Sequence, residues 1–136
     1  MHTLITELER VSTGSRELDG RIALELGWRK GLGKGYERWI APESEPEIVD
    51  SGNGHRHLLG RDHVPFFTEG MDDAETVVPP NCGWHLESDG SASVHSLKQE
   101  PEQIGFLVMG IAKGATPPLG LVIAALKARE KEQADG

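Results

Sequence analysis

The stretch that decides the fold runs Gly14-Ser15-Arg16-Glu17-Leu18-Asp19-Gly20-Arg21-Ile22-Ala23-Leu24-Glu25-Leu26-Gly27-Trp28. The Ser15 hydroxyl can cap the first turn of a helix, and the acidic residues of that turn suit the positive end of the helix dipole. Leu18, Ile22 and Leu26 recur at helical spacing and form one apolar stripe. Gly27 can adopt the left-handed conformation that ends a helix. The stretch predicts an amphipathic helix that buries its stripe on a sheet.

The remaining elements are predicted from the same kinds of pattern. In chain order they are a helix at 3–11 capped by Thr3, a short strand at 36–41, a helix at 69–78 capped by Thr68, strands at 83–87 and 92–97, a strand at 104–112 and a helix from Pro117 capped by Thr116. The strand at 104–112 is almost continuously apolar, which is typical of a strand buried on both faces. We expect an α+β fold with a small, mostly antiparallel sheet of three to four strands and helices on both faces, an α/β/α sandwich.

Two neighbouring strands are predicted to form a hairpin. The Asp89-Gly90 pair is typical of a two-residue turn. Such a turn places Trp84 opposite His95, and it puts His85 and His95 on opposite faces, so that they cannot share a metal ion. Trp84 is expected in the core because tryptophan buries a large area.

Length and composition limit the class of protein. The 136 residues predict a single domain over 1–136, with a long surface loop at about 42–63 and a frayed tail at about 132–136. The net charge of −8 argues against generic nucleic-acid binding, which needs a surplus of basic residues. The lone Cys82 suggests a reducing compartment, and we find neither a secretory leader nor a membrane span. We therefore expect a cytoplasmic protein, in a host cell if the gene is viral.

Three blocks of the sequence together resemble a known family. The first is the helix from Gly14 to Trp28. The second is Val64-Pro65-Phe66-Phe67-Thr68-Glu69-Gly70-Met71-Asp72-Asp73-Ala74, and the third runs from Ala115-Thr116-Pro117-Pro118-Leu119 to Ala124-Ala125-Leu126-Lys127-Ala128-Arg129. In this order they are similar to the phage ABA (alpha/beta/alpha) sandwich domain family. Phe67 and Met71 depart from its usual residues in the manner of core exchanges.

The resemblance implies a phage or prophage gene and an alpha/beta/alpha fold. It implies no catalytic residue and no cofactor, because the shared motifs are structural.

A basic, glycine-rich segment follows the first motif helix and is the best candidate for a ligand site. Exposed backbone amides and cations can hold phosphate, and aromatic rings can stack on a base. The segment follows a helix and lacks the Gly-Lys-Ser/Thr ending, so it matches no nucleotide-binding fingerprint. The candidate ligand-binding residues are Trp28, Arg29, Lys30, Lys34, Arg38 and Trp39. Trp39 is the tryptophan expected at a binding surface.

Other reactive side chains do not form a recognisable site. The loop histidines His55, His57 and His63 lack the paired spacing of a structural zinc site, so no metal is predicted, although their pattern leaves metal binding open. Asp72 and Asp73 are helix neighbours that point apart, and a single cysteine without a nearby base does not indicate a nucleophile. We predict no catalytic residues.

The expected function is that of a small phage or prophage accessory protein that acts by binding rather than catalysis. Its partner would be a host protein or a small molecule, and it could form a homo-oligomer. One alternative is a sponge that sequesters a nucleotide-like signal molecule through the basic loop. Another is a structural or assembly component of the virion.

Overall fold

The computed structural model describes residues 1–31, 38–42, 47–50, 56–59, 64–98, 105 and 107–135. The chain divides into two compact units, and helix α2 (Arg16–Glu25) passes from the first to the second. The first unit comprises Met1–Asp19 and Phe66–Gly136, and the second comprises Gly20–Pro65. The prediction that 1–136 forms one domain stays a prediction.

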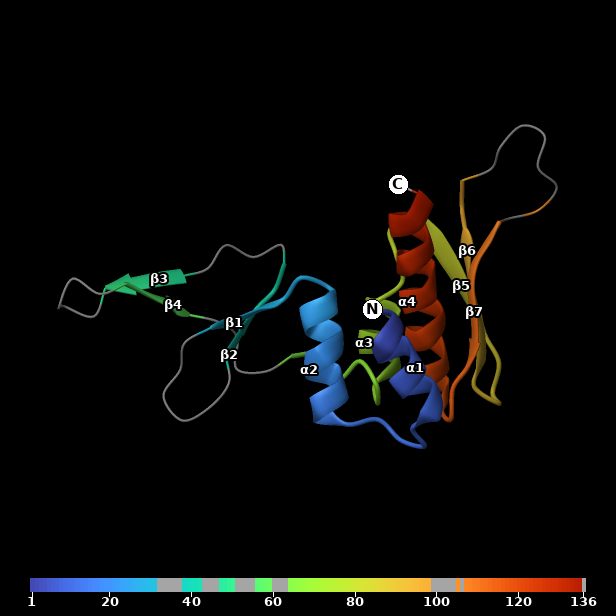
Figure 1. The fold of residues 1–136 in the computed structure, drawn as a ribbon, viewed down its shortest axis with the longest axis horizontal. Helices are drawn as coiled ribbons and strands as arrows, with labels where there is room; N and C mark the ends of the chain where they lie inside the picture. The colour runs from blue at the N-terminus through green and yellow to red at the C-terminus, as the bar shows by residue number, and fades with distance from the viewer. Residues whose placement is uncertain are drawn as a thin grey trace. The chain divides into compact units, whose positions relative to one another are not determined.

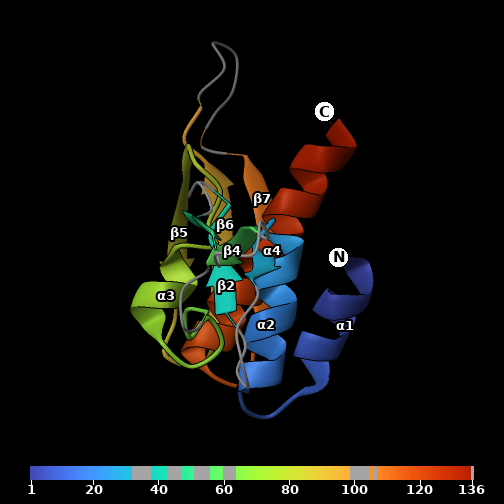
Figure 2. The ribbon, with the colours of Figure 1, turned by 90° about the vertical axis from the view of Figure 1, so that its left-hand side faces the viewer.

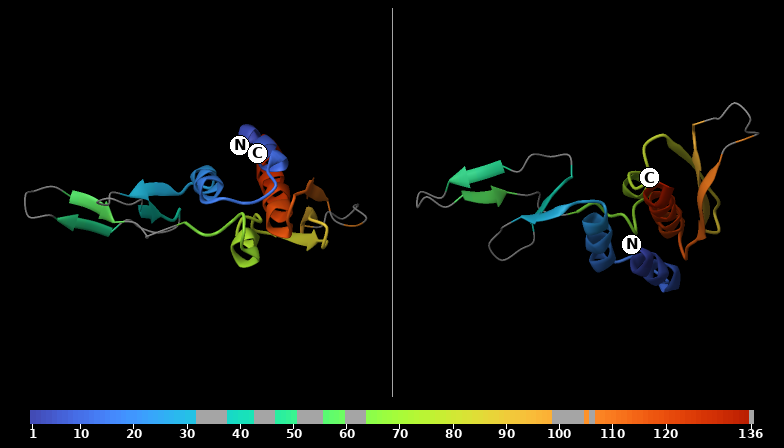
Figure 3. Two further views of the ribbon diagram at one scale, coloured as in Figure 1. Left: turned by 90° about the horizontal axis from the view of Figure 1, so that it is seen from below. Right: turned by 45° about the horizontal axis from the view of Figure 1, so that its top comes forward.

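The first unit is built around one long helix, α4 (Pro117–Asp135). A three-stranded antiparallel sheet with the order β5-β6-β7 packs against it. Figure 1 and both views of Figure 3 show this sheet on one side of α4, which is drawn in orange-red. Helices α1 and α3 also contact α4. The bounds are α1 His2–Arg10, α3 Met71–Glu75, β5 Cys82–Leu86, β6 Ser91–Ser96 and β7 Val108–Lys113.

The position of α4 follows from its sequence. Its first half is apolar around the whole circumference, and every residue from Leu119 to Leu126 is buried. A helix that is apolar all round must be enclosed, here by the sheet and by the other helices of this unit. Glycine allows β7 and α4 to approach each other closely, because a Cβ on Gly110 of β7 would lie 3.0 Å from the backbone nitrogen of Ala128 in α4. The core of the first unit therefore lies along α4.

The second unit contains two short hairpins and the C-terminal half of α2. β1 (Arg29–Gly31) pairs with β2 (Arg38–Ile40), and β3 (Glu47–Asp50) pairs with β4 (Arg56–Leu59), both antiparallel. The predicted strand at 36–41 is confirmed by β2. The surface loop expected at 42–63 instead contains β3 and β4.

Several expectations about helix ends are confirmed and others are wrong. Ser15 Oγ accepts a hydrogen bond from the Leu18 amide (3.2 Å), and Gly27 has a φ of 93°, as the motif predicts. Helix α3 is shorter than expected, because Gly70 and not Thr68 is its N-cap. Met1, not Thr3, is the N-cap of α1. At the other end of the chain, α4 continues to Asp135, and the fraying expected at about 132–136 stays a prediction.

The predicted α+β class with an antiparallel sheet flanked by helices is confirmed. Within the first unit, α4 packs on β5-β6-β7, and Figure 1 shows α1, α3 and α4 on the same side of this sheet. The strand expected to be buried on both faces, β7, is an edge strand with Ile111 62% exposed. The apolar run in the sequence therefore predicted a fully buried strand, although about half of the apolar side chains of β7 face outward.

The hairpin of β5 and β6 has a register one residue away from the expected one. Trp84 lies opposite Val94, and His95 lies opposite Gly83. The Glu87 amide bonds to the Ser91 carbonyl (2.8 Å), so three residues form the turn. Gly90, with a φ of 89°, takes its left-handed position. This extra turn residue moves every side chain of one strand to the other face.

Candidate functional site

The predicted basic ligand site falls largely on the β1-β2 hairpin. Trp28 is half-buried, and Arg29 and Lys30 are exposed on β1. Lys30 lies opposite Trp39 in the register, with its Nζ 5.4 Å from the centre of the indole ring. Trp39 is only 3% exposed, so the expectation that it forms a binding surface is wrong. The ring that would have stacked on a ligand is buried, with its edge beside Gly20 of α2.

The other residues predicted for this site are not fully described. Arg38 pairs with Gly31 through the β2 backbone, and its side chain lies outside the described residues, as does all of Lys34. The ligand-binding role of the segment therefore stays a prediction.

The histidines expected in the long loop are only partly visible. His57 belongs to β4, opposite Val49, and its side chain is not described. His55 and His63 lie outside the described residues. In the part of the chain that is described, no three His, Cys, Asp or Glu side chains are grouped to hold a metal ion.

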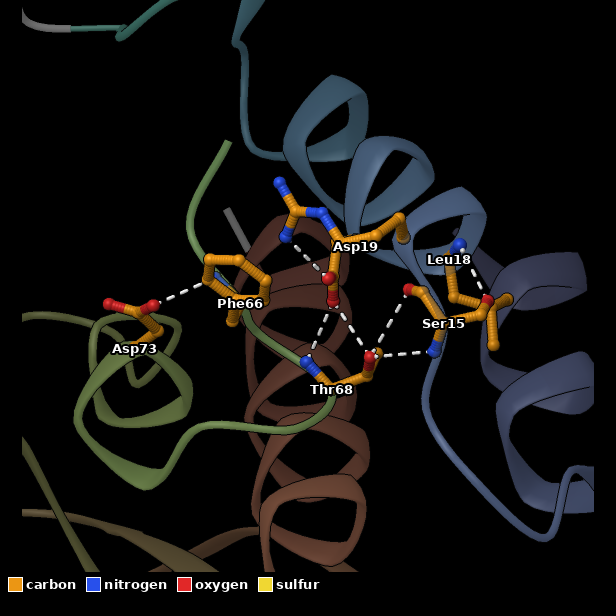
Figure 4. Close-up of polar contacts among 7 residues, drawn as sticks. Ser15, Leu18, Asp19, Phe66, Thr68 and Asp73 are labelled. Atoms are coloured by element: carbon orange, nitrogen blue, oxygen red, sulfur yellow. Dashed lines mark hydrogen bonds and ion pairs between the residues drawn. The ribbon is translucent and has the colours of Figure 1, made fainter. Parts of the chain in front are cut away.

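A buried polar network joins the first and second sequence motifs (Figure 4). Asp19 Oδ1 accepts hydrogen bonds from the amide and the hydroxyl of Thr68, both at 2.8 Å. Its Oδ2 accepts one from Arg16 (2.7 Å), and Thr68 Oγ1 accepts one from the Ser15 amide (3.0 Å). Asp19 and Thr68 are enclosed, so no substrate can reach them. The network holds the fold together, and the sequence reading of Asp19 as a dipole partner alone was incomplete.

Cys82 lies at the end of β5 beside α4. Burial, with Glu132 as a second cause, raises the pKa of its thiol, while Arg129 acts in the opposite direction. Glu132 Oε1 is 4.0 Å from the sulfur. A thiol with a raised pKa holds its proton and is a poorer nucleophile at neutral pH.

The first turn of α3 borders a shallow acidic hollow of about 520 Å³. Its wall includes Phe66, Asp72 and Asp73. Asp73 Oδ2 accepts a hydrogen bond from the Phe66 amide (2.7 Å), and the Arg16 guanidinium lies 4.0 Å over the Phe66 ring. These contacts give Asp73, Phe66 and Arg16 a structural role in this segment. We therefore do not treat the hollow as a candidate site.

The surface that stands out is the side of β5-β6-β7 turned away from α4, which we call the open face. The register places its side chains together: His85 is opposite Ser93, His95 is opposite Gly83, and Ile111 is opposite Ser93 on the other side. The imidazole of His95 lies across Gly83, where a Cβ would be 2.7 Å from Nε2. The expectation that His85 and His95 occupy opposite faces is therefore wrong.

Apolar side chains gather at one end of the open face. Leu97 is 53% exposed and Val108 is 44% exposed, and both neighbour His95. Toward the turn, a hollow of about 390 Å³ extends the face. It is lined by His85, Glu87, Ser91, Ala92, Ser93, Ile111, Ala112 and Lys113. We define the open face by His85, Ser93, His95, Leu97, Val108 and Ile111.

Sequence reasoning missed this face, although a signal was present. Residues 91–96 read Ser-Ala-Ser-Val-His-Ser, in which small apolar and polar residues alternate. Strict alternation is typical of a strand with one solvated face. The assumed two-residue turn assigned the partner side chains to the wrong face.

Comparisons with known proteins do not add to this picture: no protein-family model, no curated protein and no solved structure matches the chain. None of the helices in the described residues combines the length and apolar character needed to cross a bilayer.

Proposed function

We propose that this chain is a phage or prophage accessory protein that acts by binding a host protein through the open face, without catalysis. One observation carries the proposal. Leu97, Val108 and Ile111 are all substantially exposed on a sheet face that the described part of its unit leaves uncovered. Contiguous exposed apolar groups of this kind commonly mark protein interaction sites.

The composition indicates what sort of partner fits. The chain carries a net charge of −8, so a partner surface with basic groups around an apolar centre complements it. A nucleic-acid-binding host protein has such a surface, and occupying it would block its normal ligand. The phage origin rests on the resemblance of three sequence blocks.

Affinity capture from host extract tests the proposal. We expect the wild-type chain to capture one partner at stoichiometric levels. Ile111→Asp places a charge on the most exposed apolar residue of the open face and should abolish capture, because burying an unpaired carboxylate is costly. Leu24→Asp is the matched control, since Leu24 is similarly exposed on α2. Equal capture by both variants would sink the proposal.

The two alternatives have their own readouts. A nucleotide sponge should show a melting shift in a nucleotide panel that Lys34→Ala or Arg38→Ala removes. A virion component should be found in purified particles at a fixed copy number. Either result, with no capture of a host protein, would replace the proposed function.

A further inference from the structure

We infer that the free edge of β5 binds one extended segment of a partner protein as an added strand, and that this segment carries a basic residue near each end. The site is the outward backbone of Cys82–Leu86. Although β5 also carries His85 of the open face, the site consists of backbone groups at the sheet edge, so the inference does not depend on the proposed function.

The hydrogen-bond pattern shows which backbone groups face outward. The Glu87 amide bonds to Ser91, and the Leu97 amide bonds to Asn81, both at 2.8 Å. Pairs in an antiparallel ladder alternate between bonded and non-bonded. Trp84 and Leu86 therefore direct their amides and carbonyls away from β6. No described strand pairs with them (Figure 2 shows β5 at the opposite side of β6 from β7).

The two edges of the sheet differ. On β7, the outward carbonyl of Ile111 accepts a hydrogen bond from Lys127 Nζ at 3.1 Å. Lys127 belongs to α4, and covering an edge strand with a helix is one protection against strand addition. In the described part of the chain no such side chain covers Trp84 or Leu86. Strand addition is therefore directed to β5.

Trp84 supplies the apolar contact for an added strand. It shares the α4 side of the sheet with Val94 but is 38% exposed, because it stands on the last strand. A strand added beside β5 would bring a side chain within about 5 Å of its Cβ. The segment should therefore carry an apolar or β-branched residue at its centre.

Acidic side chains stand near both ends of this edge. Glu87 follows β5 directly, and Glu132 lies 4.0 Å from Cys82 at the other end. The nearby cation Arg129 is half-buried and donates from Nε to the Val77 carbonyl (2.6 Å), and its charge also interacts with that of Glu132. Positions 82 and 87 are five residues apart, about 16 Å along a strand. A basic residue at each end of a six-residue segment matches this spacing.

The same charges favour a basic segment over a second copy of this chain. Antiparallel pairing of two β5 strands about Trp84 would place Glu87 of one copy opposite Asn81 of the other, which carries no charge. A basic extended segment brings a cation to each acidic side chain.

The test uses the full-length chain and a blocked peptide, acetyl-Lys-Val-Thr-Val-Thr-Lys-amide. Amide hydrogen exchange is followed by NMR at Trp84 and Leu86, with the Ile111 amide on the guarded edge as internal control. At a peptide concentration ten times its Kd, we expect exchange at Trp84 and Leu86 to slow about tenfold. Exchange at Ile111 should not change.

Two controls separate backbone pairing from charge. A peptide N-methylated at alternate residues cannot pair and should not slow exchange. Glu87→Gln and Glu132→Gln should each weaken binding of the peptide by a factor of about 2 to 5. Neither substitution should change the binding of a control peptide in which serine replaces both lysines. Protection at Ile111 instead of Trp84, no protection up to about 5 mM peptide, or a dimer that protects Trp84 without peptide would overturn the inference.

Discussion

At the residue scale, Thr68 is the side chain that links the two N-terminal motifs. Its hydroxyl accepts from the Ser15 amide and donates to Asp19, and the site is enclosed. The same closeness explains the glycine of the first motif: a Cβ on Gly14 would lie 2.6 Å from Thr68 Cβ. The sequence suggested only that Thr68 caps a helix, because its partners are about fifty positions away.

Thr68→Val should lower the free energy of unfolding by about 1–3 kcal/mol, since it removes one of the two hydrogen bonds to Asp19 Oδ1 and takes away the acceptor of the Ser15 amide. Urea denaturation measures this change. Thr76→Val is the matched control, because Thr76 Oγ1 donates to the Asp73 carbonyl at an exposed position (2.6 Å). Equal losses in the two variants would contradict the role given to Thr68.

The reactivity of the Cys82 thiol at a given pH provides a second prediction. Burial and then Glu132 raise the pKa of its thiol, so the thiolate fraction at pH 8 is lower than in a free cysteine. Glu132→Gln removes the second cause, lowers the pKa and should speed alkylation by iodoacetamide at pH 8. Glu130→Gln on the same helix is the control and should not change the rate. Slower alkylation of the Glu132→Gln variant would show that Glu132 does not raise the pKa of the Cys82 thiol.

At the element scale, the contact of α4 with β7 depends on glycine. Gly110→Ala would place its Cβ against the Ala124 carbonyl and should cost about 1–3 kcal/mol of stability, because neither backbone can move aside easily. Gly20→Ala in α2 meets only ordinary contacts at 3.5 Å and should stabilise the chain by about 0.5–1 kcal/mol. Thermal unfolding of both variants tests whether Gly110→Ala lowers and Gly20→Ala raises the stability. If both variants are destabilised, the close approach of α4 and β7 does not explain the effect at Gly110.

The elements also show how far the sequence predicts the fold. Local signals located the motif helix, with Ser15 at its start and Gly27 at its end, because caps depend on neighbouring residues. The face of each β5-β6 side chain was not predictable in this way. It depended on one extra turn residue, and the left-handed Gly90 fits both a two- and a three-residue turn. The open face was missed because of this turn and because the apolar run that contains β7 predicted a strand buried on both faces. The basic hairpin was found, but its Trp39 was wrongly predicted to be exposed.

At the scale of the whole molecule, the net charge of −8 should govern association with a partner. Binding of a captured host protein should weaken when NaCl rises from about 50 to about 500 mM, because salt screens the attraction between unlike surfaces. Titration calorimetry at the two concentrations measures the effect. An affinity independent of salt would indicate that the apolar part of the open face acts alone and that the partner is not basic.

The bond from Lys127 to the Ile111 carbonyl also bears on how large an assembly can grow. A sheet with two receptive edges can extend without limit, since each added copy offers a new edge. If β5 is the receptive edge and β7 is guarded, the β5 edge of one copy cannot pair with the β7 edge of the next. Loss of the Lys127 charge, by acetylation for example, would then expose β7 and permit such head-to-tail growth.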